Sequence, residues 1–253
     1  NNTSGDYNTA VGYISLNVNT FGKYNTAVGN RSLRSNTTGN NNSGFGYSSL
    51  ANNTIGTNNS AFGYQALKSN TTGNNNIAVG TNALYYNITG TNNVAVGYTA
   101  LLYNTGGNNT AIGANSLYSN TIGTNNTAVG YQALYTNTTN NNSAFGYKAL
   151  FANTTGIHNT AVGHASLSAN TIGERNTAVG YASLNVNTTG SYNSAFGSYA
   201  LLSNTIGYSN TAIGYNSLNN NTTGATNTAI GRNALIANTI GSSNVAVGSF
   251  SLS

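Results

Sequence analysis

The sequence predicts an all-β chain folded as a parallel β-solenoid (β-roll), with coils of about 17 residues and about 15 coils. The first observation is a phrase close to Asn-Thr-Ala-Val-Gly, which starts at Asn8, returns at Asn25 and Asn42, and starts for the last time at Asn244. A fixed short period is typical of solenoids, in which each repeat stacks on the next. The second is the density of Gly, Asn and Thr, which disfavours helices. The third is the absence of proline, which leaves every backbone N–H able to bond a neighbouring coil.

The repeat has the consensus N-T-A-V-G-Y-x-A/S-L-x-x-N-T-T/I-G-x-x, and its positions are counted from the first Asn. Position 15 is Gly except at Asn140. Asn tolerates a left-handed backbone better than other non-glycine residues, so we expect a corner with positive φ there. The coils that begin at Asn93 and Asn126 are one residue shorter than the others. Aligned on the consensus, they lose that residue just after this corner, which predicts an exposed loop at positions 16 and 17.

Positions 1 to 5 are expected to form a strand. Wherever position 4 is Phe, position 2 is the small residue Ser, as in Ser60 and Phe62. Such an exchange of volume indicates two side chains on one face, and residues i and i+2 share a face in a strand but not in a helix. We expect a second short strand and a second corner to complete each coil. Charged residues avoid positions 2–5, 8, 9 and 12–15, so these positions are expected to be buried or tightly paired.

The expected core is thin. Each coil offers two dependable large apolar side chains, at position 4 and at Leu in position 9, with Ile at some of the position-14 sites. Because small cross-sections bury little surface, we expect a homo-oligomer in which one strand face meets a partner chain. Asn at positions 1 and 12 would stack into amide ladders. The alternative for the many Asn-x-Thr/Ser triplets is N-glycosylation, but attached sugars would disrupt the stack.

The repeat is similar to two groups of surface proteins. N-T-A-V-G resembles the N-S-V-A-I-G motif of trimeric autotransporter adhesin heads, and the longer NTAVGYQALYTNTTN, from Asn126, resembles repeats of bacteriophage tail fibres. The resemblance covers the whole chain, although this strand motif is one residue shorter than that of the adhesins and the coil is longer. It implies a left-handed solenoid, a homotrimer and an extracellular place on a virion or cell surface. We read residues 1–253 as a single uninterrupted array without a linker, cut from a longer fibre protein.

No catalytic, cofactor or metal site is expected. The two carboxylates, Asp6 and Glu174, lie ten coils apart, too far for an acid–base pair. His158 and His164 suggest a metal pair, but Cys and carboxylate ligands are missing nearby, which favours two surface histidines. Only 4% of residues are charged, too few for a nucleic-acid footprint. No apolar run reaches the roughly 18 residues of a membrane span, so we expect no membrane insertion in this segment.

One surface column has the chemistry to bind a ligand. Position 6 is Tyr in eight coils, and stacked phenol rings could hold a glycan through ring contacts and hydroxyl hydrogen bonds. The alternative is that Tyr merely suits an exposed β surface and covers the ladder beneath. The candidate glycan contacts are Tyr13, Tyr47, Tyr64, Tyr98, Tyr131, Tyr147, Tyr181 and Tyr215.

The sequence favours a structural function: the trimeric, rigid shaft or head of a phage tail fibre or bacterial adhesin, which presents or contributes to attachment to a host glycan or receptor. One alternative is an extracellular filament or sheath subunit, joined through open sheet edges. Another is a solenoid that binds polysaccharide or ice, suggested by the Thr residues at positions 2 and 13. Against ice binding, the exchange of volume between positions 2 and 4 indicates that Thr at position 2 is packed rather than displayed.

Overall fold

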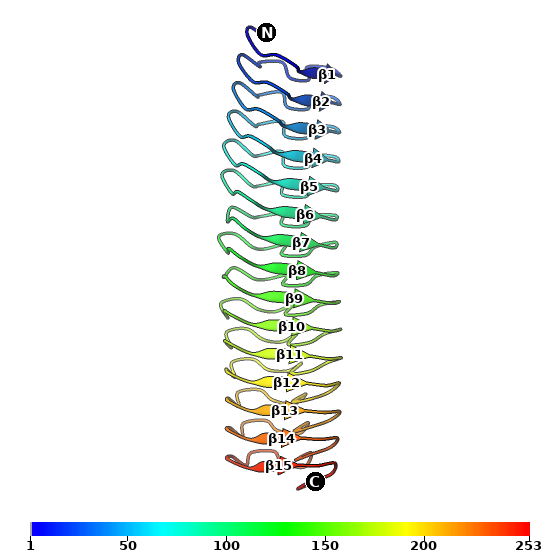
Figure 1. Ribbon diagram of the computed structural model, residues 1–253, viewed down its shortest axis with the longest axis vertical. Coiled ribbons are helices and arrows are strands. Elements are labelled where there is room, and N and C mark those ends of the chain that lie inside the picture. The colour runs from blue at the N-terminus through cyan, green and yellow to red at the C-terminus, as the bar shows by residue number, and fades with distance from the viewer. Residues whose placement is uncertain (1) are drawn as a thin grey trace. The chain divides into compact units, whose positions relative to one another are not determined.

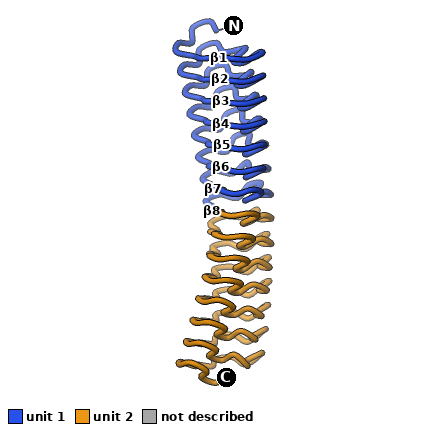
Figure 2. The backbone as a smooth tube through the Cα atoms, turned by 90° about the vertical axis from the view of Figure 1, so that its right-hand side faces the viewer, with its two compact units in different colours: residues 1–126 blue, residues 127–253 orange. Residues whose placement is uncertain are grey.

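The computed structural model describes residues 2–253, which contain fifteen parallel strands of three residues each and no helix. The chain divides into two compact units, residues 1–126 and 127–253 (Figure 2). In unit 1 the strands are β1 (Thr9–Val11), β2 (Thr26–Val28), β3 (Ser43–Phe45), β4 (Ser60–Phe62), β5 (Ile77–Val79), β6 (Val94–Val96) and β7 (Thr110–Ile112). In unit 2 they are β8 (Thr127–Val129), β9 (Ser143–Phe145), β10 (Thr160–Val162), β11 (Thr177–Val179), β12 (Ser194–Phe196), β13 (Thr211–Ile213), β14 (Thr228–Ile230) and β15 (Val245–Val247).

The predicted parallel β-solenoid is confirmed in each unit, because every repeat forms one coil. Within a unit, consecutive strands are neighbours in the sheet (Figure 1). Thr9 pairs with Thr26, its equivalent in the next repeat, and the short repeat pairs Val94 with Thr110 in the same way. The coil that begins at Asn25 also bonds to its neighbours away from the strand: the Leu33 amide donates to the carbonyl of Ser49 at 3.0 Å. Each coil is therefore held to the next around its circuit.

The interior of a coil is narrow. Ala at position 3 and Leu at position 9 are buried in all coils between the end coils, together with Ala or Ser at position 8, except that Gly44 replaces Ala in β3. The glycine at position 5 shows how closely coils approach. A Cβ atom on Gly46 would lie 2.5 Å from the carbonyl oxygen of Gly63, and Gly46 has a φ of +129°. Small residues thus let neighbouring backbones come together.

The predicted amide ladders are confirmed. At position 1 the Asn193 side chain donates to Asn176 Oδ1 at 3.2 Å and to the carbonyl of Gly207 at 2.8 Å. At position 12 Asn187 donates to Asn170 Oδ1 and to the carbonyl of Gly190. These side chains are buried, and buried amides must be hydrogen-bonded to avoid a large desolvation cost. Because the Asn187 amide nitrogen is inside and bonded, an Asn-x-Thr triplet that begins at position 12 is closed to glycosylation in the folded chain.

The interpretation of positions 4 and 14 as part of the core of the coil is wrong. Positions 2 and 4 do share a face, as the exchange of Ser and Phe predicts, but this face points outward. Phe62 and Phe145 are about 40% exposed, and the stacked rings of Phe45 and Phe62 lie 4.9 Å apart on that face. At position 14 the five Ile side chains are 52–72% exposed. The repeat positions that never carry a charged residue are therefore of two kinds: some lie inside the coil, and others lie on its outer surface.

The second strand expected in each coil is absent from the described residues, and turns replace it. The residues at positions 7 and 9 and the residue before position 1 have φ between 47° and 61° in every coil. Left-handed residues at 7 and 9 break the extended backbone, and the reversal at position 9 turns Leu inward. This conformation costs roughly 1–2 kcal/mol per non-glycine residue, so each coil carries strain that stacking must offset.

The explanation for position 15 is also wrong. Neither its glycines nor Asn140 has positive φ. Glycine is required because a Cβ atom would collide with the next coil: on Gly56 it would meet the Gly73 carbonyl oxygen at 2.5 Å. The short coils lose their residue before this corner, not after it. Asn104 bonds the carbonyl of Gly106, two residues on, whereas Asn87 bonds Gly90, three residues on.

The same shift moves the corner in the coil that begins at Asn126. Asn137 bonds the carbonyl of Thr139, so Thr139 and not Asn140 replaces the corner glycine. The Thr139 hydroxyl donates to the carbonyl of Gly156 at 2.8 Å.

The prediction of an exposed loop at positions 16 and 17 holds in part. The residue before position 1 is exposed in most coils, whereas many residues at position 16 are half-buried.

Candidate functional site

The eight predicted tyrosines all lie on the outer surface, 40–70% exposed. They follow the outward strand, after the glycine at position 5 turns the chain. In unit 1, Tyr47 and Tyr64 stack at 5.3 Å with their planes 11° apart. Tyr13 and Tyr98 have no ring neighbour within the described part of unit 1, because other residue types occupy position 6 beside them. At position 6, the described part of unit 1 therefore carries two single tyrosines and one stacked pair.

In unit 2 the column is longer and includes a histidine. Tyr131 stacks on Tyr147 at 5.5 Å, and His164 lies between Tyr147 and Tyr181 at 4.8 and 5.1 Å. At its end Tyr199, from position 7, meets both Tyr181 and Tyr215 edge to face. Stacked aromatic pairs contribute about 0.5–1.5 kcal/mol beyond the area they bury. Much of this column is therefore explained by contacts between coils.

The histidines and carboxylates have local partners. His158 faces the Asn141 side chain at 3.4 Å, whereas His164 belongs to the aromatic column. Asp6 pairs with Lys23 at 2.8 Å, and Glu174 lies 3.6 Å from Arg175. Within residues 2–253, no three His, Cys, Asp or Glu side chains gather closely enough to hold a metal ion. That part of the chain also contains no helix with the length and hydropathy to cross a membrane.

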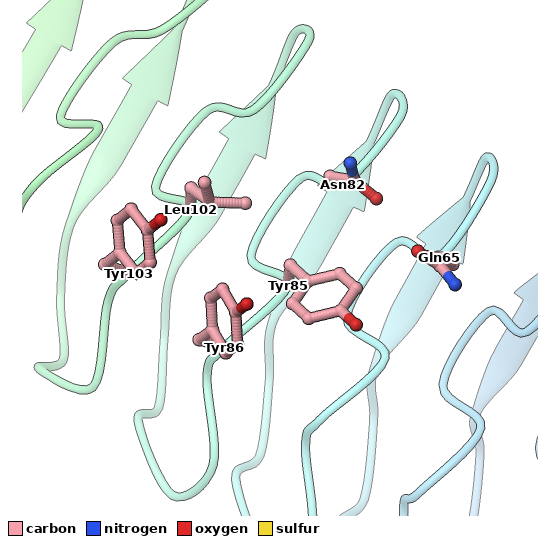
Figure 3. A pocket seen from close by; sticks show the side chains of 6 residues that line it. All are labelled: Gln65, Asn82, Tyr85, Tyr86, Leu102 and Tyr103. Carbon is pink, nitrogen blue, oxygen red and sulfur yellow. The ribbon is translucent and has the colours of Figure 1, made fainter.

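A groove in unit 1 brings together residues that the sequence did not single out. It has a volume of about 260 Å³ and lies across the coils of β4, β5 and β6. Figure 3 shows Tyr86 and Tyr103 side by side on consecutive coils, with Tyr85 turned toward Gln65. The lining residues are Gln65, Asn82, Tyr85, Tyr86, Leu102 and Tyr103.

The three rings of the groove form a corner: two of them are parallel, and the third is inclined to both. Tyr86 stacks on Tyr103 at 5.1 Å with planes 6° apart, while Tyr85 meets Tyr86 at 4.5 Å and 67°. Lys68 holds Tyr85 in place: its ammonium donates to the Tyr85 hydroxyl at 2.8 Å and lies 5.0 Å from the ring centre. The Tyr85 ring, which is inclined to the Tyr86 ring, is thus fixed by a cation on the preceding coil.

Polar groups meet this aromatic corner. Gln65 and Asn82 both occupy position 7 and carry amide groups that donate and accept hydrogen bonds. Asn82 Oδ1 is buried and has no hydrogen-bond partner, which costs roughly 1–3 kcal/mol for a buried acceptor. Asn233, at the same position in unit 2, is also unpaired, but no residue at position 11 near it is aromatic.

A sequence signal for the groove exists. Position 11 is aromatic in two coils, at Tyr86 and Tyr103, and these coils are consecutive. Elsewhere it is Val, Ser, Asn, Thr or Ala. Comparing coils at positions that vary, rather than positions that repeat, would have found the pair.

No protein-family model matches the chain, and no curated protein matches it.

Proposed function

We propose that this chain is a structural element, the rigid shaft or head of a phage tail fibre or bacterial surface adhesin. It would act outside the cell or on a virion, holding an attachment site away from the surface that carries it. The observation that carries the proposal is the double amide ladder, which joins coil to coil in each unit through buried Asn side chains, as at Asn187 and Asn193. Bending a unit would break these bonds together with the backbone bonds beside them.

We further propose a homotrimer in which the outward strand face is covered by the partner chains. The face made by positions 2 and 4 is free of charge and displays apolar side chains such as Val162, Phe196 and Ile213. Contiguous exposed apolar surface of this kind marks interaction sites in soluble proteins. The resemblance of the repeat to trimeric adhesin heads and tail fibres agrees with this assignment.

The test is the mass of the protein in solution. Sedimentation equilibrium at micromolar concentration should give three times the chain mass of 25.9 kDa. Val162→Lys should dissociate the trimer, because it places a charge on the outward face. Ile172→Lys, on an exposed side chain at position 14, is the matched control and should leave the trimer intact. A stable wild-type monomer would contradict the proposal, and species of indefinite size would favour the filament alternative.

Ice binding is a second candidate, because the direction of the strand face weakens the argument against it. Thr at position 2 lies on the outward face and is half-buried rather than inside the coil, as at Thr160 and Thr177 on adjacent coils. However, the Thr hydroxyls at position 13 are used internally: Thr171 donates to the carbonyl of Thr188 at 3.0 Å. The column at position 2 is also interrupted by Ser143 and Ser194. Thermal hysteresis of the purified protein decides it, since an ice binder would depress the freezing point below the melting point.

A further inference from the structure

We propose that the groove of unit 1 is a binding site for a single ring of a neutral saccharide. It contains none of the eight position-6 tyrosines, and a shaft has no mechanical need for it. The inference therefore goes beyond the proposed structural function and does not depend on it.

The size of the groove fits one sugar ring. Its volume of about 260 Å³ lies just below the roughly 300–1,000 Å³ of sites that hold drug-sized ligands. The corner between Tyr85 and Tyr86, whose planes differ by 67°, offers aromatic surface in two directions. The C–H groups of a pyranose carry a small positive charge, which suits the negative face of an aromatic ring.

The polar groups fit sugar hydroxyls. The amides of Gln65 and Asn82 can each donate and accept, as a vicinal pair of hydroxyls requires. Asn82 Oδ1 is buried and has no partner in the folded chain, so turning the Asn82 amide over would break no hydrogen bond of that oxygen and would let it accept from a ligand hydroxyl. None of the six lining residues is charged, and the one cation nearby, Lys68, is directed at the hydroxyl and ring of Tyr85. The site therefore favours a neutral ligand over an anionic one.

A nucleobase fits less well. Aromatic sites for bases place the base flat against a ring face, but Tyr86 and Tyr103 are only 5.1 Å apart and already stacked on each other. No base can enter between them. The ligand must lie in the corner, where a puckered ring with hydroxyls at its edge meets more of the lining.

The experiment is saturation-transfer NMR on the full chain with four probes: the methyl glycosides of glucose, galactose, mannose and N-acetylglucosamine. At least one should bind, and Tyr86→Ala should weaken it at least tenfold. Phe151→Ala is the matched control, because Phe151 stacks on Tyr135 at 5.3 Å but has Ala152 beside it at position 11. This control should bind as the wild type does.

Three results would overturn the proposal. None of the four glycosides binds; Tyr86→Ala and Phe151→Ala bind alike; or adenosine binds while the glycosides do not. Tyr181→Ala, in the aromatic column of unit 2, must leave binding unchanged, since a loss there would assign the sugar to the column instead. Circular dichroism confirms that each variant is folded, and Gln65→Leu, which removes only an amide, repeats the test should Tyr86→Ala disturb the coil. Sedimentation of the wild type tests the trimer separately.

Discussion

The amide-ladder side of each coil and its tyrosine-bearing side are made by the same repeats, but they tolerate change very differently. On the ladder side, positions 1, 9 and 12 are Asn, Leu and Asn in each complete coil, and these residues are buried between the end coils except for the half-buried Asn238. On the other side, positions 6, 7, 10 and 11 vary from coil to coil. Repetition thus marks what holds the coils together. A site that recognises a ligand is to be sought where one coil departs from the others, as at Tyr86 and Tyr103.

The sharpest contrast between interior and exterior is a pair of adjacent leucines. Leu201 is buried at position 9, whereas Leu202 at position 10 is half-buried. We expect Leu201→Ala to lower the free energy of unfolding by about 2–5 kcal/mol, the range for buried Leu→Ala changes. Leu202→Ala should lower it by about 1 kcal/mol, which is typical of point mutations in general. Urea denaturation followed by circular dichroism, at one protein concentration, measures both, and equal losses would contradict the assignment of the core.

A pair of adjacent asparagines tests the ladder itself. Asn221 donates to Asn204 Oδ1 and to the carbonyl of Gly224, and accepts from Asn238. Asn221→Ala leaves a buried acceptor unpaired, so we expect a loss of about 2–3 kcal/mol. Asn220, one residue earlier, is exposed, and Asn220→Ala should change stability by less than about 0.5 kcal/mol. If the two variants unfold at the same urea concentration, the ladder does not stabilise the fold.

Two adjacent glycines test where the short coil loses its residue. A Cβ atom on Gly106 would collide with the carbonyl of Gly123, whereas on Gly107 the nearest atom is the Thr91 carbonyl oxygen at 3.0 Å. Overpacking of this kind costs about 1–3 kcal/mol, so Gly106→Ala should lose that much and Gly107→Ala distinctly less. Thermal melting of both variants provides the comparison. If Gly107→Ala lost more stability than Gly106→Ala, the corner would lie at Gly107, where the consensus alignment places it.

The smallest effect is expected at the exposed ion pair of Lys23 and Asp6. The hydrogen bond to the Asp6 carboxylate, with its charge, raises the pKa of Lys23 above the ordinary 10.5. A raised pKa adds stability below the unfolded pKa, and this is lost as the pH rises through the folded pKa. The side chains are 48% and 57% exposed, and such pairs contribute little. Lys23→Met should have the same melting temperature as the wild type at pH 7. Any small difference should vanish once the pH has risen through the raised pKa of Lys23. A large difference in melting temperature at pH 7 would show that the ion pair stabilises the fold.

Much of the fold could be predicted from the sequence because the repeat is long and nearly invariant. Its period gives the coil, and the exchange between Ser60 and Phe62 gives the shared strand face. Whether that face points into the coil or outward could not be read from the sequence, because Thr, Val and Phe suit an interior and a protein interface equally well. The left-handed backbone at position 9 also has no signal in the sequence. Leu normally avoids that backbone, and only the packing of Leu33 and its equivalents in a narrow coil selects it.

The candidate site could be predicted only in part. The tyrosine column follows directly from the repeat, since equivalent positions of stacked coils lie in line. The groove depends on residues from different positions, Gln65 at 7 and Tyr86 at 11, and on a turn conformation that the sequence does not reveal. The moved corner at Thr139 was missed for a related reason: a consensus alignment places a gap by letters, whereas the hydrogen bond of Asn137 places it by geometry.

The most direct test of the fold is hydrogen exchange of individual backbone amides, measured by NMR on the full chain. If each repeat is one coil bonded to both neighbours, the Leu184 and Thr177 amides, which donate to Ala200 and Asn193, should exchange slowly together with their equivalents in the inner coils of each unit. The amide of Tyr181, which donates no backbone hydrogen bond within residues 2–253, should exchange quickly. Fast exchange at Leu184 and Thr177, no slower than at Tyr181, would contradict the solenoid.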